Sequence, residues 1–199
     1  MTVLLFVRHG ATAWNDAGRI QGRRDLPLTP FAHAALAERR LPDGFGEPPR
    51  WVSSPLLRAR QTACALGAVE LEIEPRLAEM DWGGWEGRSL PSLRAELGDA
   101  MRENEAHGLD FETPAGDSPR RVQARLRPWL AEIAGSDRVV VAVSHKGVGR
   151  ALLALAIGWD MKAKASVRVR WEHAQRFEIA SSGEPRLVEP NIALARRDG

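Results

Sequence analysis

Two short runs of branched apolar residues stand out along the chain, at positions 3–7 and 139–143. Neither run alternates with polar residues, so each is typical of a strand that is buried on both faces, as in a parallel sheet. The first run leads to His9 and the second to His145. Ligands in open α/β sheets bind beyond the carboxyl ends of the strands. The pattern therefore predicts that the two histidines face each other, although they lie far apart in the sequence.

Helical patterns fill much of the remaining chain. Thr29 is the predicted N-cap of a helix over residues 32–40, with Pro30 at the first helical position. A strand at 51–55 leads into a helix over 56–66 that carries Arg58 in its first turn, where backbone N–H groups favour anions. Further helices are predicted over 89–105, 118–133 and 149–157, a strand over 70–73, and an antiparallel edge hairpin from strands at 167–171 and 176–180.

This succession of elements predicts a three-layer α/β/α sandwich with a mostly parallel central sheet and an antiparallel edge strand. A chain of 199 residues is long enough to bury a substantial core, and we expect one domain over residues 1–199. The tail after Asn191 carries no strong pattern and is expected to be mobile.

Composition narrows the class of protein. Hydrophobic residues make up 44% and charged residues 27% of the chain, values typical of a soluble globular protein. The 28 basic and 26 acidic residues nearly balance, which argues against nucleic acid as the main partner. No apolar stretch approaches the ~20 residues of a membrane span, and the N-terminal run lacks the basic flank of a signal peptide. We therefore expect no membrane partner.

The single cysteine, Cys64, excludes an intramolecular disulfide and a thiolate cluster for metal binding. This cysteine usage favours a reducing cytoplasm. Cys64 itself is expected to be a small core residue.

The residues beside the two predicted strand ends suggest phosphoryl chemistry. An imidazole that attacks phosphorus must be neutral, while the transferring phosphoryl group needs several N–H donors in a prepared pocket. Arg8, Arg58 and His145 could supply those donors around His9. Each residue alone would more simply be a strand-end histidine bonded to backbone or an exposed charge, so the interpretation depends on their occurring together.

Several segments, in order along the chain, resemble the histidine phosphatase superfamily, which includes cofactor-dependent phosphoglycerate mutases and many small phosphatases. They are RHGATAWN at 8–15, GRIQGRRDLPLT at 18–29, SSPLLRARQTA at 53–63, LAEMDWGGWEG at 77–87 and VSHKGV at 143–148. The resemblance covers nearly the whole chain, and the ordered set is far more specific than any one segment.

The resemblance implies a role for each of these residues. His9 would be the nucleophile that becomes phosphorylated, and Glu79 would protonate the leaving oxygen and then activate water. Asp81, two residues further on, is the alternative acid. No cofactor and no metal ion are expected, because the arginines and histidines supply the positive charge. The remaining implied site residues are Arg8, Arg58 and His145 for holding the phosphoryl oxygens, and Asn15, Gln21, Gly22 and Lys146 for binding the substrate.

The chain also departs from the family pattern. Position 11 is Ala where Glu or Gln is frequent, and Lys146 stands where Gly is frequent. The loop around Glu79 lacks the Tyr-containing sequence that resembles a true mutase, since the chain has no Tyr. The first two departures remove no catalytic group. The missing Tyr-containing sequence, together with a chain shorter than typical mutases, favours a metal-independent phosphomonoesterase that acts on a small phosphorylated metabolite through a phosphohistidine.

Two alternatives stay open at this stage. A phosphoglycerate mutase-type enzyme would isomerise phosphoglycerate when primed by a bisphosphorylated cofactor. A noncatalytic phospholigand-binding protein is disfavoured, because a decayed site would be expected to lose one of the implied catalytic residues. The physiological substrate depends on the packing of residues 78–112, in which Trp82 and Trp85 could pack or line the substrate mouth. The resemblance leaves a homodimer open as well.

Overall fold

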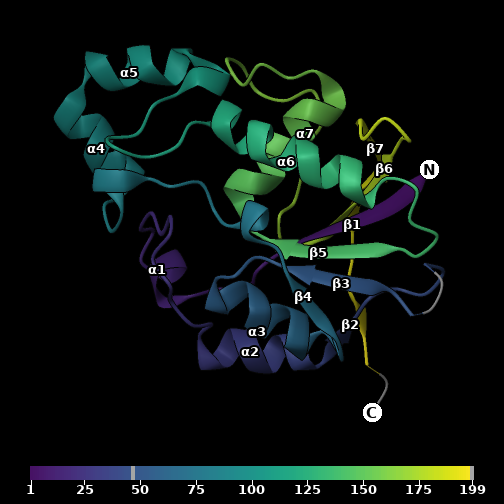
Figure 1. Cartoon of the computed structure of the whole chain (residues 1–199). Helices are drawn as coiled ribbons and strands as arrows, with labels where there is room; N and C mark the ends of the chain where they lie inside the picture. Colours follow the sequence, from purple (N-terminus) through teal and green to yellow (C-terminus); the bar gives the residue numbers. More distant parts are fainter. Residues whose placement is uncertain (46–47, 198–199) are drawn as a thin grey trace.

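The computed structural model describes residues 1–45 and 48–197, and within them a six-stranded sheet lies between layers of helices (Figure 1). Its strand order is β4-β3-β5-β1-β6-β7. The first four strands in this order are parallel, and β6 and β7 complete the sheet as an antiparallel hairpin. The strand bounds are Leu71–Ile73 for β4, Arg50–Ser53 for β3, Val140–Ser144 for β5, Thr2–Arg8 for β1, Ala174–Ile179 for β6 and Pro185–Ile192 for β7. The predicted sandwich with its antiparallel edge is confirmed.

Helices cover both faces of the sheet. Figure 1 shows α2 and α3 on one face, and α6 and α7 on the other. Their bounds are Pro30–Ala37 for α2, Leu57–Ala65 for α3, Pro119–Ile133 for α6 and Lys146–Ile157 for α7. The remaining helices are α1 (Ala13–Asp16), α4 (Leu90–Leu97) and α5 (Asp99–Ala106), with single 3₁₀ turns η1 (Pro75–Leu77), η2 (Gly83–Trp85) and η3 (Gly108–Asp110).

The central strands are buried on both faces, as their apolar runs predicted. Leu4 and Phe6 of β1 pack in the core cluster under α6 and α7, while Leu5 and Val7 pack in the opposite cluster with α3. Strand β1 pairs in parallel with β5 so that Arg8 lies opposite Ser144, the last residue of each strand. The two strands therefore end side by side, which brings the residues that follow them, His9 and His145, to the same edge of the sheet.

Two predicted helices are shorter than expected. Helix α2 is capped by Thr29, whose Oγ1 accepts the Ala32 N–H, but it ends at Ala37. The next residues form β2 (Arg39–Arg40), which pairs with β8 (Ala195–Arg196). The helix predicted over 89–105 is divided into α4 and α5 at Gly98, whose φ of 54° ends one helix and begins the next.

The prediction of a hairpin from residues 167–171 and 176–180 is wrong in its first strand. Strand β6 pairs with the following segment, β7, while residues 167–171 form no strand. Asn191 of β7 explains the difference. Its side-chain oxygen accepts the Arg170 N–H at 2.5 Å and its amide nitrogen donates to the Arg168 carbonyl at 2.9 Å. A side chain thus satisfies backbone groups that a partner strand would otherwise bond.

The segment after Asn191, expected to be mobile, finishes β7 and then pairs as β8, whereas residues 198 and 199 lie outside the described part. Cys64 is exposed on α3, so its assignment to the core is wrong. In the described part of the chain, every helix is too short or too polar to cross a bilayer.

Candidate active site

The two histidines meet at the edge of the sheet, as the sequence predicts. The backbone N–H of His9 donates to the backbone carbonyl of Ser144 at 2.9 Å, which ties the end of β1 to the end of β5. The two imidazole rings lie 5.1 Å apart between centroids, at an angle of 56°. Both are buried. A small chemical group that is bound beside one imidazole ring can therefore contact the other ring as well.

His9 carries an imidazole that is neutral and oriented. Burial, followed by the charges of Arg58 and Arg8, lowers the pKa of His9 to about 3. Its Nδ1 lies 2.6 Å from the Gly10 carbonyl oxygen, which can only accept a hydrogen bond. Nδ1 therefore carries the proton, and Nε2 keeps a free lone pair. An imidazole in this state can act as a nucleophile at neutral pH.

His145 is completely buried and is anchored by Ser54. Its Nε2 lies 2.7 Å from Ser54 Oγ, which also accepts the Leu56 N–H at 3.3 Å. Burial first, and then the neighbouring His9 and Arg58, hold the pKa of His145 well below its usual value. Within the described residues its Nδ1 has no hydrogen-bond partner. Since buried polar atoms are nearly always bonded, Nδ1 is available to a ligand.

Arg58 is fully buried in the first turn of α3, and the loop after α1 holds it in place. Its two terminal nitrogens donate to the carbonyls of Gly22 at 2.8 Å and Arg24 at 2.7 Å. Asp25 from the same loop accepts the Leu57 N–H at 2.6 Å and so caps α3. Burial lowers the pKa of Arg58, and likewise of Arg8, but guanidinium groups remain charged in proteins. In the described structure the Nε atoms of both arginines are buried without a partner.

Glu79, in the loop that follows η1, lies against the first turn of α7 at the same site. Its carboxylate accepts the Met80 N–H at 2.8 Å and the Gly147 N–H at 3.2 Å, and the side chain is 9% exposed. A Cβ at Gly147 would lie 2.4 Å from the Glu79 carboxylate, so only glycine permits this approach. Asp81 is occupied differently. Its Oδ1 accepts the Gly83 N–H at 2.8 Å at the start of η2.

The other predicted substrate-binding residues occupy different positions around this centre. Asn15 forms a capping box with Thr12, and the Thr12 hydroxyl also lies 2.8 Å from Gln21 Oε1. Gly22 holds Arg58 through its carbonyl, and a Cβ there would collide with Glu86. Gly22 thus supports Arg58 directly, whereas Asn15 and Gln21 meet through Thr12.

Lys146 begins α7 beside His145 and is exposed. Partial burial, and then the charges of Arg8 and Arg150, lower the pKa of its ammonium group. It is thus a solvent-accessible cation at the rim of the site.

The side chains of Trp82 and Trp85 pack against Phe111 and the core. Their rings lie 5.7 Å and 5.9 Å from the ring of Phe111, between centroids, and both are partly buried against the core under α6. Packing is therefore the role that the described contacts support.

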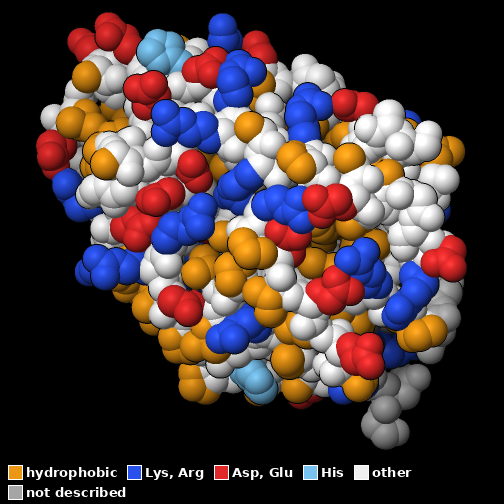
Figure 2. Space-filling view, viewed as in Figure 1, with side chains coloured by type: hydrophobic (Ala, Val, Ile, Leu, Met, Phe, Trp, Pro, Cys, Tyr) orange, Lys and Arg blue, Asp and Glu red, His pale blue; other side chains and the backbone are white. Residues whose placement is uncertain are grey.

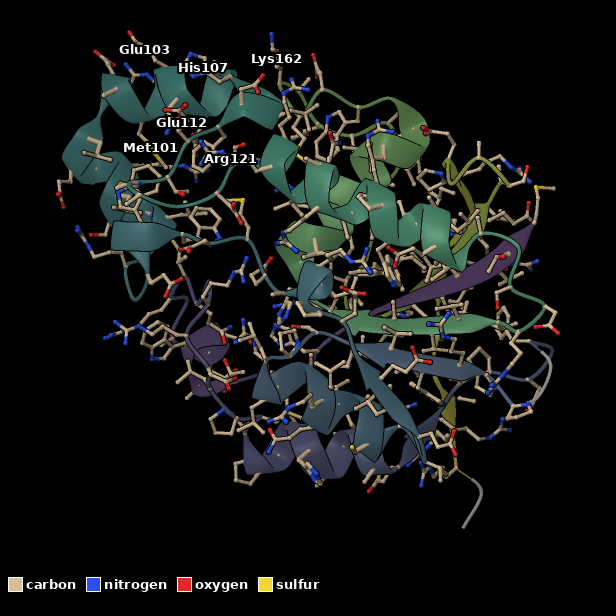
Figure 3. The ribbon with its side chains drawn as sticks, in the orientation of Figure 1. Met101, Glu103, His107, Glu112, Arg121 and Lys162 are labelled. Carbon is tan, nitrogen blue, oxygen red and sulfur yellow. The ribbon has the colours of Figure 1, made fainter. Side chains whose placement is uncertain are left out.

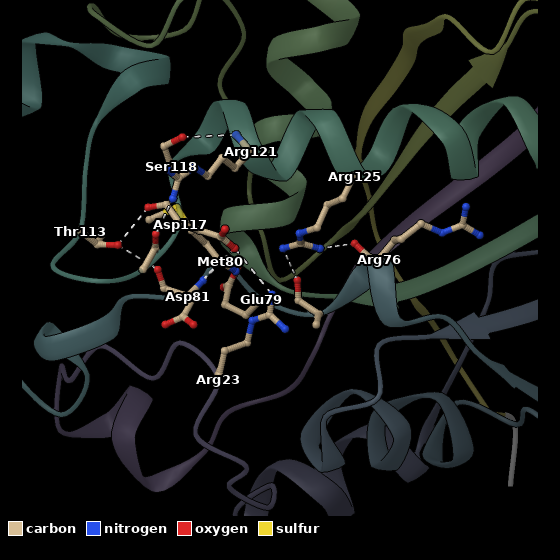
Figure 4. Close-up of polar contacts among 12 residues, drawn as sticks. Arg23, Arg76, Glu79, Met80, Asp81, Thr113, Asp117, Ser118, Arg121 and Arg125 are labelled. Atoms are coloured by element: carbon tan, nitrogen blue, oxygen red, sulfur yellow. Dashed lines mark hydrogen bonds and ion pairs between the residues drawn. The ribbon is translucent and has the colours of Figure 1, made fainter.

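Sequence reasoning missed Ser54, which anchors His145, and Arg125, which donates to the backbone just before Glu79 (Figure 4). Ser54 lies near the carboxyl end of the strand predicted over 51–55, so its place at the sheet edge was a usable signal. Arg125 had none, because it lies inside a predicted helix like any charged residue on a helix surface.

On the face seen in Figure 2, basic and acidic side chains are intermingled. Figure 3 shows Glu103 on α5 and His107 just after this helix, both at the periphery of the molecule. Across residues 1–45 and 48–197, no three His, Cys, Asp or Glu side chains are grouped so as to hold a metal ion.

Comparison with known proteins identifies the family. The family model of the histidine phosphatase superfamily (branch 1) matches residues 4–192. The chain belongs to the histidine phosphatase superfamily. The prediction from its ordered segments is thereby confirmed.

Relatives within the histidine phosphatase superfamily carry two kinds of name. A 2,3-bisphosphoglycerate-dependent phosphoglycerate mutase of Methylobacterium radiotolerans is 35% identical over 180 residues, covering 83% of this chain and 82% of that protein. A probable phosphoglycerate mutase of Yersinia pestis is 34% identical over 182 residues, covering 85% and 81%. The structure of a mycobacterial glucosyl-3-phosphoglycerate phosphatase in complex with VO3 superposes with a TM-score of 0.78, at 28% identity, over 97% of this chain and all of that one. The superfamily relatives thus include both mutases and phosphatases.

Proposed function

We propose that this protein is a metal-independent phosphomonoesterase that acts on a small phosphorylated metabolite through a phosphohistidine. One observation carries the proposal. A neutral imidazole with a free Nε2 is flanked by three residues, Arg8, Arg58 and His145, each with a buried nitrogen that lacks a partner in the described structure. A phosphoryl group with three charged oxygens would satisfy such nitrogens.

The first half-reaction transfers the phosphoryl group to the protein. His9 Nε2 attacks phosphorus and forms the N–P bond, while the bond from phosphorus to the leaving oxygen breaks. Glu79 gives its proton to that oxygen. Because Ser54 Oγ accepts the Leu56 N–H, its own hydroxyl proton is free to donate to His145 Nε2. His145 Nδ1 then carries a proton and donates to a phosphoryl oxygen.

The second half-reaction releases phosphate. Water attacks phosphorus, Glu79 accepts a proton from that water, and the N–P bond breaks. The carboxylate serves as acid and then as base because the two half-reactions move the proton in opposite directions. Glu79 suits this role better than Asp81, because the Glu79 carboxylate contacts Gly147 beside His145 and its charge acts on Arg8 and Arg58, whereas Asp81 binds the η2 turn.

Lys146, Asn15 and Gln21 bind the substrate in this proposal. The exposed ammonium group of Lys146 lies beside His145, where it would contact an anionic part of the leaving group. Asn15 and Gln21, which both contact Thr12, would contribute their side-chain amides to substrate binding.

The experiment is release of phosphate from p-nitrophenyl phosphate in excess EDTA. We expect wild-type activity to survive EDTA, and we expect a folded His9→Ala variant to lose it. The exposed His33 provides a matched control, since His33→Ala should keep wild-type activity. Trapping ³²P on the protein in acid-labile form should succeed with wild type and fail with His9→Ala. Release that needs a metal ion, or that persists without His9, would refute the mechanism.

A mutase is the second candidate, because the two curated relatives described above, both more than 30% identical, are named as a mutase and a probable mutase. The same preparation would be assayed for conversion of 3-phosphoglycerate to 2-phosphoglycerate with and without 2,3-bisphosphoglycerate. Primer-dependent isomerisation faster than hydrolysis would establish the mutase instead. Binding of phosphate without either reaction would indicate a noncatalytic phospholigand-binding protein.

A further inference from the structure

Arg125, on α6, is a half-buried cation whose terminal nitrogens bond only to backbone. One donates to the carbonyl of Arg76 and the other to the carbonyl of Ala78, the latter at 2.6 Å (Figure 4). Burial, and then the charge of Arg23, lower the pKa of Arg125 to about 10. Within residues 1–45 and 48–197, no carboxylate lies at ion-pair distance from it, and its Nε has no partner.

This arrangement differs from that of neighbouring arginines. Arg127, two residues along α6, is exposed and pairs with Glu184 at 2.9 Å. Arg76 pairs with Glu74 and Glu132. Removing a guanidinium from water without an acidic partner is unfavourable, so the fold gains something else from the position of Arg125.

The backbone that Arg125 holds leads directly into Glu79. The carbonyl of Leu77, between the two that Arg125 binds, accepts the Ser144 hydroxyl at 2.7 Å. Three consecutive carbonyls before Glu79 are therefore fixed by side chains from α6 and β5. Glu79 then meets the N–H of Gly147 on α7. The direction of its carboxylate depends on this chain of contacts.

We propose that Arg125 is a positioning residue for proton transfer. It holds the backbone on both sides of Leu77 so that Glu79 reaches the leaving oxygen and later the attacking water. This inference rests on the proposed phosphohistidine mechanism and adds to it the residue that places the acid.

The test compares two aryl substrates of similar shape. p-Nitrophenolate departs readily without a proton, whereas phenolate benefits more from protonation by an acid. For Arg125→Met we expect kcat/KM to fall about tenfold further with phenyl phosphate than with p-nitrophenyl phosphate. Arg127→Met, on the same helix, should leave both values and their ratio unchanged. Arg125→Lys keeps the charge but loses the pair of guanidinium nitrogens that bind the two carbonyls. The difference between the two substrates in the fall of kcat/KM should then be intermediate, and this variant tests the role of Arg125 if Arg125→Met folds poorly.

A double-mutant cycle tests whether Arg125 acts through Glu79. In a Glu79→Gln background, adding Arg125→Met should change kcat/KM for phenyl phosphate by less than about threefold. An equal fall in kcat/KM with both substrates, or full additivity of Arg125→Met with Glu79→Gln, would overturn the positioning role of Arg125 and leave the phosphatase function standing. If wild type hydrolyses neither substrate, the phosphatase function is overturned and this inference with it.

Discussion

Gly147→Ala places a methyl group against the proposed acid. The added Cβ would lie 2.4 Å from Glu79 Oε1 and 3.2 Å from its Cδ, whereas ordinary contacts begin at 3.4 Å. The carboxylate must therefore move by about 1 Å, which is easy for the end of a flexible side chain. A displacement of that size at reacting groups can reduce rate about 10²-fold. We expect kcat/KM for phenyl phosphate to fall by that factor.

The stability of the same variant should change little. Loss of hydrogen bonds to the carboxylate costs about 1.5–3 kcal/mol at most, while alanine is favoured over glycine inside a helix by about 1 kcal/mol. Urea unfolding should therefore show a change in the free energy of unfolding of no more than about 2 kcal/mol.

A glycine in the neighbouring loop supplies the control. A Cβ at Gly84 would lie 3.6 Å from the nearest atom, Cβ of Pro114, so Gly84→Ala should retain activity. Wild-type kcat/KM in a folded Gly147→Ala protein would refute the placement of Glu79 as the acid.

Further predictions concern the anchors of the site and its response to pH. Ser54→Ala leaves buried His145 without its Nε2 partner, so we expect the free energy of unfolding to fall by about 1–3 kcal/mol, measured in urea, together with a loss of kcat. Asp25→Ala removes the cap at Leu57 and should cost about 1 kcal/mol in the same assay; an unchanged midpoint would contradict the capping role. The folded pKa of His9 is about 3 against 6.5 when unfolded, so between these values the unfolded chain binds one more proton. The free energy of unfolding should thus decrease as the pH falls from 6.5 to 5, and His9→Ala should weaken that dependence; identical slopes would contradict the neutral imidazole.

The sequence by itself was sufficient for the parts of the site that follow directly from local pattern. Two apolar runs long enough for buried strands, each leading to a histidine, predicted the meeting of His9 and His145 at one sheet edge. The helix start after residues 51–55 placed Arg58 in the first turn of α3. These predictions succeeded because strand burial and helix start signals depend on residues close together in the chain.

Only the tertiary structure decided which distant segments complete the site. Arg58 donates to carbonyls of a loop that lies more than 30 positions earlier in the sequence. Arg125 donates to the carbonyl of Ala78, which precedes α4 and α5 in the chain. The same limit explains the hairpin: alternation at 167–171 matched a strand, but the side chain of Asn191 took the backbone bonds. Local pattern determines which conformations are favourable. Partners for buried polar groups are chosen only when the chain packs, because most such groups bond to whatever segment lies beside them in the fold.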